Sequence, residues 1–253
     1  SIAFSVMRTV GPAAAGFLIA WVGAAWNFAL QGLLYFGVAA IALMIDTPHE
    51  EARRVVNTTA WADMKEGLRF AATDPVARMM VLLGLVPALL LIPSFSALMP
   101  VFAVKVFAAG PQGLGLLLSA VGAGGVVGGV AAVWVARFDR VGLTQTLALL
   151  AFAASLIGFA LSPNIAVAAV FLMAAGMAEM VHMSSNVTTL QMCAPPEMRG
   201  RVASLLPMFP ALMALGSLTS GIGADLVGAP ALVTLTSLAA AGAAAAAWAG
   251  SAA

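Results

Sequence analysis

Long runs of apolar residues, separated by short polar or Gly- and Pro-containing breaks, fill most of this chain. A helix that crosses the hydrocarbon core of a bilayer needs about 20 apolar residues. Eight runs have a suitable length, and they predict membrane-spanning helices over residues 1–22, 24–45, 79–101, 114–136, 143–161, 165–191, 202–227 and 230–249. The apolar residues are continuous rather than alternating, as expected of helices and not of strands.

Composition supports an all-α integral membrane protein. The chain of 253 residues is 62% hydrophobic and only 8% charged, whereas soluble domains are roughly 45–50% apolar and about 25% charged. So few charges cannot cover a water-facing surface, which excludes a soluble enzyme, a nucleic-acid-binding protein and a disordered chain. The net charge of +1 and the scattered basic residues also give no signal for a polyanionic partner. The main partner is therefore expected to be the lipid bilayer.

The basic residues predict how the helices are oriented. Nine of the eleven Lys and Arg residues follow the second, fourth and sixth predicted spans, namely Arg53, Arg54, Lys65, Arg69, Arg78, Arg137, Arg140, Arg199 and Arg201. The positive-inside rule assigns loops enriched in Lys and Arg to the cytoplasm. With an even number of spans, both termini of this chain are expected on the cytoplasmic side of the inner membrane.

The longest connection, residues 46–78, is the only stretch that resembles ordinary soluble protein. Trp61, Met64, Leu68 and Ala71 fall on one face of a helix there, which predicts a short amphipathic helix at the cytoplasmic interface. We expect this segment to link two bundles, with residues 1–45 as the last two helices of an N-terminal bundle and residues 79–253 as a six-helix C-terminal bundle.

An internal repeat supports this division. The first and seventh predicted spans share small residues at an offset of 205, namely Gly11 with Gly216, Gly16 with Gly221 and Gly23 with Gly228. Both spans run from the cytoplasm outward, as expected of parallel halves related by an axis along the membrane normal. A period of six helices implies that the eight spans belong to a protein of twelve, with four further helices before residue 1.

Three motifs carry a resemblance to a known family. They are RTVGPAAAG at residues 8–16, DRVG at residues 139–142, and LQ at residues 190–191 followed by PEMRGRV at residues 196–202. On these the chain resembles the major facilitator superfamily of transporters, from the fifth to the twelfth helix, and within it the efflux branch of enterobactin-exporter-like permeases. Ala15 replaces a glycine of the first motif, and Val135 replaces the leading glycine of the second.

The resemblance implies gating roles for residues in these motifs. In the first, Gly11, Pro12 and Gly16 allow a helix to bend and pack closely, although generic tight packing explains them as well. In the second, Asp139 and Arg140 before Gly142 can form a cytoplasmic charge lock or simply an anchor. Arg199 and Arg201 are placed similarly, where they can pair Glu197 or lipid phosphates. Two GxxxG pairs, Gly124–Gly128 and Gly125–Gly129, predict close helix packing.

Ionisable residues at membrane depth are the strongest candidates for function, because burying each costs at least about 2.5–3.5 kcal/mol. Glu179, His182 and Asn186 follow the spacing i, i+3, i+7 and so share one face of the sixth predicted span. A carboxyl group removed from water binds a proton more readily, and histidine titrates near neutrality. We therefore regard Glu179 and His182 as proton-coupling candidates; the alternative is that they only bond each other. The resemblance adds that this helix lines the central cavity.

Other polar residues are weaker candidates. Asn27 and Gln31, on the second span, can contact substrate together with Asn186, or bond neighbouring helices. Arg8 can snorkel to the interface or pair with an acid of helices outside this chain. Glu-x-x-His is a di-iron spacing, but such a site needs further carboxylates from other helices, so neither a metal nor another cofactor is expected. No reactive constellation predicts an enzyme.

The sequence thus predicts a secondary active transporter that exports a small, partly hydrophobic molecule, drug- or siderophore-like, by proton antiport with alternating access. Two alternatives stay open. One is a truncated or degenerate membrane protein without transport activity. The other is an uptake permease of the same superfamily.

Overall fold

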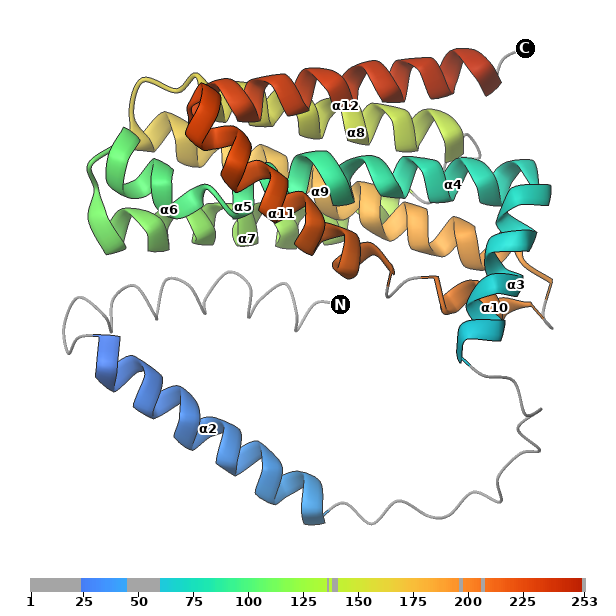
Figure 1. Cartoon of the computed structure of the whole chain (residues 1–253), viewed down its shortest axis with the longest axis horizontal. Helices are drawn as coiled ribbons and strands as arrows, with labels where there is room; N and C mark the ends of the chain where they lie inside the picture. Colours follow the sequence, from blue (N-terminus) through green and yellow to red (C-terminus); the bar gives the residue numbers. More distant parts are fainter. Residues whose placement is uncertain are drawn as a thin grey trace.

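The computed structural model describes residues 24–44, 60–135, 137, 141–195, 198–205 and 208–251, which are helical apart from short connections (Figure 1). In chain order the helices are α2 (Ala24–Met44), α3 (Ala60–Thr73), α4 (Pro75–Val86), η1 (Pro87–Leu91), α5 (Ile92–Ser96), α6 (Met99–Val101), η2 (Phe102–Val106), α7 (Gly110–Val135), α8 (Val141–Ala160), α9 (Ile165–Cys193), α10 (Arg199–Ala203), α11 (Met208–Val227) and α12 (Ala229–Ser251).

Six segments of the described residues are long and apolar enough to cross a membrane. They are Pro75–Val106, Gly110–Val135, Gly142–Ala160, Ile165–Cys193, Arg199–Val227 and Ala229–Trp248. These correspond to the last six of the eight predicted spans, with ends shifted by a few residues. The second predicted span is the helix α2, whose apolar part Phe28–Met44 is shorter. The first predicted span, residues 1–22, lies outside the described residues.

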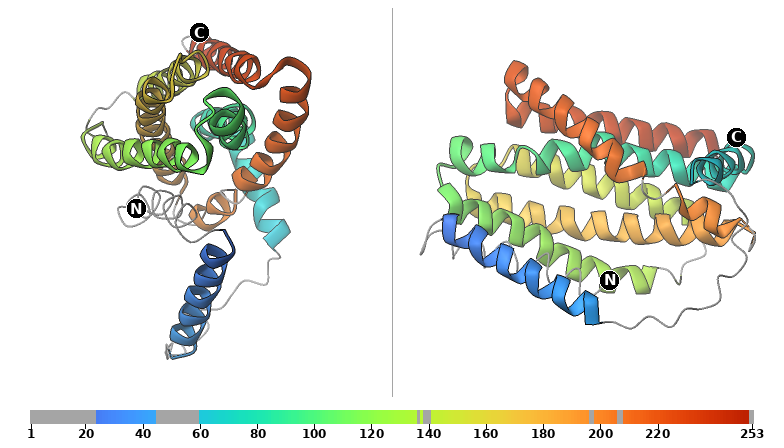
Figure 2. Two further views of the ribbon diagram at one scale, coloured as in Figure 1. Left: turned by 90° about the vertical axis from the view of Figure 1, so that its left-hand side faces the viewer. Right: turned by 60° about the horizontal axis from the view of Figure 1, so that its bottom comes forward.

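The Pro75–Val106 segment forms the centre of the bundle. It is in contact with α7, α8, α9, α11 and α12, and the left view of Figure 2 shows these helices around it. Phe95 meets Phe152 of α8 edge-on, with ring centroids 6.0 Å apart. The ring centroids of Phe102 and Phe159 are 4.4 Å apart. By contrast, α2 lies apart from the bundle in Figures 1 and 2, with its large apolar side chains exposed.

Prolines reshape this central segment without ending it. Pro87, Pro93 and Pro100 lack a backbone donor, so a regular α-helix cannot continue through them unchanged. The chain adopts two π-helical turns instead, η1 and η2, in which the hydrogen bonds run to a carbonyl five residues back, as from Phe107 N to Phe102 O at 2.8 Å.

Glycines bring α7 and α9 into backbone contact. A side chain at Gly124 would meet the backbone of Met173, and one at Gly128 would meet that of Met177. Gly176 of α9 approaches the backbone of Val121 in the same way. The GxxxG pair Gly124–Gly128 therefore packs against a helix as expected. The overlapping pair Gly125–Gly129 instead faces the Met180 side chain, with room left for a methyl group.

The linker differs from its prediction in two respects. The helix α4 already begins at Pro75, with Asp74 as its N-cap accepting a 2.7 Å hydrogen bond from Ala77 N, so the boundary expected between residues 78 and 79 falls inside a helix. The expected amphipathic helix is α3. Of its predicted apolar face, Ala71 is buried and Met64 packs partly buried against the core, but Leu68 is 39% exposed. Gly67 is buried instead.

Close contact with α10 explains the burial of Gly67. A side chain at Gly67 would meet the backbone carbonyl of Arg201, so α3 and α10 touch through their backbones. Beside this contact, Glu66 Oε1 lies 2.6 Å from Arg201 Nη1. The seventh predicted span corresponds to α11 and the last two residues of α10. Residues 206–207, between these helices, lie outside the described part.

Candidate functional site

A half-open cavity of about 670 Å³ lies between the helices of the bundle and is mostly apolar. Its walls come from α4, η1, α5, α7, α8, α9 and α11, and include the rings of Phe95, Phe152 and Phe209. Its polar side chains come mainly from α9, which supplies Glu179, His182 and Asn186. Small-molecule sites typically measure roughly 300–1,000 Å³ and combine apolar walls with a few polar groups. The cavity has this size and character.

The regularity of α9 places its three polar side chains together. Asn164 caps the helix by accepting a 3.0 Å hydrogen bond from Val167 N, and the helix then runs unbroken for 29 residues. Residues at i, i+3 and i+7 of such a helix share a face. Glu179, His182 and Asn186 are 6%, 3% and 3% exposed, so all three are buried where the sequence predicted a shared face.

Asn186 ties α9 to the central segment. Its Nδ2 donates a 2.8 Å hydrogen bond to the backbone carbonyl of Met80 in α4. Gly84 lies one turn further along α4, beside this bond. A methyl group at Gly84 would be crowded, because it would lie 3.3 Å from Asn186 Oδ1 and 2.9 Å from the Phe209 ring. The end of the cavity near Asn186 is therefore tightly packed.

His182 contacts the backbone of α8. Its Nδ1 lies 3.4 Å from the carbonyl oxygen of Gln145. A carbonyl can only accept, so Nδ1 carries the hydrogen in this contact. In the neutral ring, Nε2 is then the nitrogen with the free lone pair. Nε2 is buried and has no partner at hydrogen-bonding distance within the described part of the chain, although the backbone of Leu83 in α4 also interacts with the ring.

Gln145 is a member of this polar group that sequence reasoning missed. Its side chain is fully buried, and Nε2 lies 3.7 Å from the sulfur of Met80. Its Oε1 has no hydrogen-bonding partner among the described residues. The signal was present in the sequence, because Gln145 is an amide near the start of the apolar run 143–161. Gln145 and His182 join α8 to α9 much as Asn186 joins α9 to α4.

Comparison with known families decides what kind of protein this is. A family model described as transmembrane secretion effector, of major facilitator type, matches residues 1–251. The chain belongs to this family. No curated protein matches the chain significantly. No solved structure matches it either.

Membership makes this secretion effector a multi-pass membrane transporter and not an enzyme. The cavity lies among the membrane-length helices of this family member. Among the described residues, no group of three His, Cys, Asp or Glu side chains could hold a metal ion. What the cavity offers chemically is the carboxyl group of Glu179, the imidazole of His182, the amide of Asn186 and the hydroxyl of Ser96.

The remaining candidates of the secretion effector are scattered. Gln31 is exposed on α2, away from the cavity. Gly142 lies in the first turn of α8, where its carbonyl accepts a 2.9 Å hydrogen bond from Thr146. Arg199 Nε donates to the carbonyl of Ala194 at 3.4 Å, and Arg201 pairs with Glu66. The others lie outside the described residues: Arg8, Gly11, Pro12, Gly16, the side chain of Asn27, Asp139, Arg140 and Glu197.

Proposed function

We propose that this secretion effector exports a small, partly hydrophobic molecule across the cytoplasmic membrane in exchange for protons, with Glu179 and His182 binding the proton. The observation that carries this proposal is the burial of both side chains on one face of α9, in the wall of a cavity of about 670 Å³. Ionisable groups at membrane depth are costly and are retained mainly where they act.

The geometry around His182 supports a role in proton binding. Donation from Nδ1 to the Gln145 carbonyl holds the ring in one tautomer and orientation. The proton is then gained and lost at Nε2, on a nitrogen that makes no hydrogen bond within the described residues. Glu179, three residues earlier on the same face, is the carboxyl group nearest in sequence that can exchange a proton with it.

The walls of the cavity support a partly hydrophobic substrate. Phe95, Phe152, Phe209, Met183 and Met213 offer aromatic and thioether surfaces, which adapt to ligands of varied shape. A substrate with an apolar body and one polar group would place that group beside Asn186, Glu179 and His182. The cycle we envisage is alternating access in a protein of twelve helices. Residues 1–45 and the helices from Pro75 onward would belong to two bundles that rock about the site, joined by the segment that includes α3.

Transport by the purified full chain tests the proposal. The protein is reconstituted into proteoliposomes of known orientation, and a panel of fluorescent drug-like dyes and catecholate siderophores is screened with and without an imposed pH gradient. We expect substrate movement driven by the gradient, outward with respect to the cell. Gradient-driven movement of substrate inward with respect to the cell would contradict export.

The Glu179→Gln variant tests the proton-binding step. We expect it to lose gradient-driven transport while retaining substrate exchange in the absence of a gradient. Asp225→Asn is the matched control, because Asp225 is also a carboxylate in an apolar segment but is exposed on α11 and does not line the cavity. Gradient-driven transport by Glu179→Gln equal to that of the parent would refute the proton role.

A further inference from the structure

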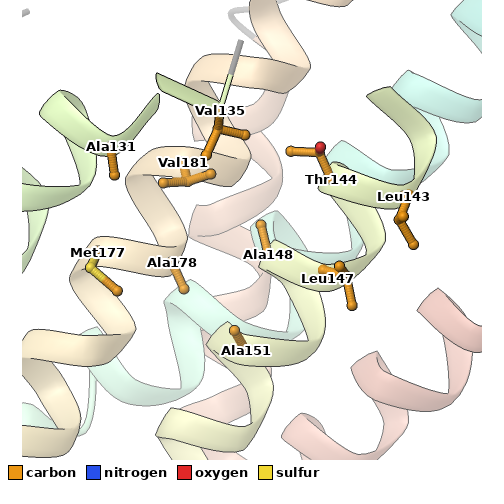
Figure 3. Close-up of a pocket in the computed structure, with 10 residues that line it drawn as sticks. All are labelled: Ala131, Val135, Leu143, Thr144, Leu147, Ala148, Ala151, Met177, Ala178 and Val181. Carbon is orange, nitrogen blue, oxygen red and sulfur yellow. The ribbon is translucent and has the colours of Figure 1, made fainter. Parts of the chain in front are cut away.

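A second cavity, also of about 670 Å³, lies between α7, α8 and α9 (Figure 3). The figure shows α9 as its floor, with Ala178 and Val181, and α7 and α8 as its two walls. Both walls pack along α9. Ala131, Ala148 and Ala151 are small enough to leave the space between the walls open.

This groove opens on the outside of the bundle and is apolar. Leu147 and Met177, at its rim, are 55% and 40% exposed. Thr144 carries the only hydroxyl among the residues that line it, and none of these residues is charged. In a multi-pass membrane protein such a surface meets lipid chains, so the groove differs from the inner cavity, which carries Glu179 and His182.

A cation–π pair marks the polar end of the groove. Val135, the last residue of α7, lines the groove near the first residues of α8 (Figure 3). One residue before it, Trp134 is exposed, and two residues after it, the guanidinium of Arg137 lies 4.7 Å from the centroid of the Trp134 ring. Exposed Trp and Arg residues at the end of a spanning helix are typical of the level of lipid headgroups.

We propose that this groove binds an acyl chain of an anionic phospholipid whose phosphate pairs with Arg137. Moving a lipid acyl chain from the bilayer into the groove contributes little binding free energy, since the tails of the surrounding lipids are as apolar as the side chains that line the groove. Preference for one lipid must therefore come from the headgroup. Arg137, which is exposed and follows the lining residue Val135 by two positions, supplies a positive charge and planar donors that suit a phosphate.

Quenching of Trp134 fluorescence by brominated lipids tests the proposal. In the full chain, the other four tryptophans (Trp21, Trp26, Trp61 and Trp248) are replaced by Phe. The protein is then reconstituted with phosphatidylglycerol or phosphatidylcholine that carries bromine on its acyl chains. We expect phosphatidylglycerol to reach half-maximal quenching at about one-fifth of the concentration, the preference that one basic residue near an anionic lipid confers.

Two variants separate a bound lipid from the surrounding bilayer. Ala148→Phe fills the groove and is expected to abolish the headgroup preference, whereas Ala166→Phe, at an exposed position of α9, is expected to retain it. Arg137→Gln changes an exposed side chain and leaves the shape of the groove unchanged, so the variant should fold normally. It is expected to abolish the headgroup preference as well. Lys65→Gln, on α3, is its matched control.

Three results would overturn the proposal. Equal quenching by the two lipids would mean that the groove holds only unselected bilayer lipid. A headgroup preference that survives Ala148→Phe would place the lipid elsewhere on the surface. Absence of quenching by either lipid would mean that protein, either another segment of this chain or a second copy, covers the groove.

Discussion

Glu66 Oε1 and Arg201 Nη1 lie 2.6 Å apart and join two helices, although the two residues are 135 positions apart in the sequence. The pair connects α3, in the linker, to α10, which precedes the last two helices of the bundle. Their side chains are 45% and 31% exposed, so water and salt screen much of their attraction. The neighbouring backbone contact between Gly67 and Arg201 therefore contributes to docking independently of charge.

Replacing Glu66 by Gln is expected to weaken this docking only slightly. Half-exposed ion pairs contribute roughly 0–1 kcal/mol, and the loss should shrink further as salt is raised. Thermal unfolding in detergent at low and high salt measures the effect. Lys65→Gln, at the exposed neighbouring position, is the control and should change little. A loss that persists undiminished in high salt would mean that packing, and not charge, carries the contribution of Glu66.

Gly128→Ala is expected to destabilise the bundle. The added methyl group would meet the backbone of Met177, and backbone cannot move aside as a flexible side chain does. Gly129→Ala is the matched control, because the nearest atom to its methyl group would be Met180 Cγ at 4.0 Å. Alanine there should be neutral or stabilise the helix by up to about 1 kcal/mol. The melting temperatures of the two variants are compared, and that of Gly128→Ala should be the lower. Equal melting temperatures would contradict the close packing of α7 and α9.

Asn186→Leu is expected to loosen the attachment of α9 to α4. It keeps most of the side-chain volume but removes the 2.8 Å hydrogen bond to the Met80 carbonyl. Hydrogen bonds between membrane helices contribute about 0.6 kcal/mol on average and up to about 1.7 kcal/mol. Unfolding in mixed micelles of mild detergent and dodecyl sulfate gives the free energy. Thr188→Val, at an exposed position of the same helix, should leave it unchanged.

Gln145→Leu is expected to raise the unfolding free energy. The buried Oε1 has no hydrogen-bonding partner among the described residues, and an unsatisfied buried acceptor costs about 1–3 kcal/mol. Leucine removes that cost while the backbone carbonyl of residue 145 still accepts from His182. The same micelle assay measures the change, with Gln112→Leu at an exposed position as control. A clear loss of stability would instead reveal a partner for Oε1.

Much of this architecture could be read from hydrophobicity and helical periodicity. Six apolar runs correspond to six membrane-length helical segments because a bilayer demands length and apolarity above all. Glu179, His182 and Asn186 share a buried face because helix geometry alone relates i, i+3 and i+7. The start of α4 was also readable, since Asp74 followed by Pro75 is a helix N-terminus signal that the predicted boundary at residue 78 overlooked.

Contacts between distant segments could not be read in this way. The partners of Asn186 and His182 are backbone carbonyls, which every residue possesses, so no side-chain pattern singles out Met80 or Gln145. On α3 the prediction was wrong for Leu68, which is exposed, for a similar reason. The contact with α10 is made at Gly67, which has no side chain and so gives no apolar signal.

The glycine contacts between α7 and α9 limit how this transporter can move. With backbone against backbone at Gly124, Gly128 and Gly176, the two helices can neither slide past each other nor part without a clash or a void. We therefore expect the helix that bears Glu179 and His182 to move together with α7. In the facing wall of the cavity the α-helix is interrupted by the π-helical turn η1, which is where we expect that wall to bend.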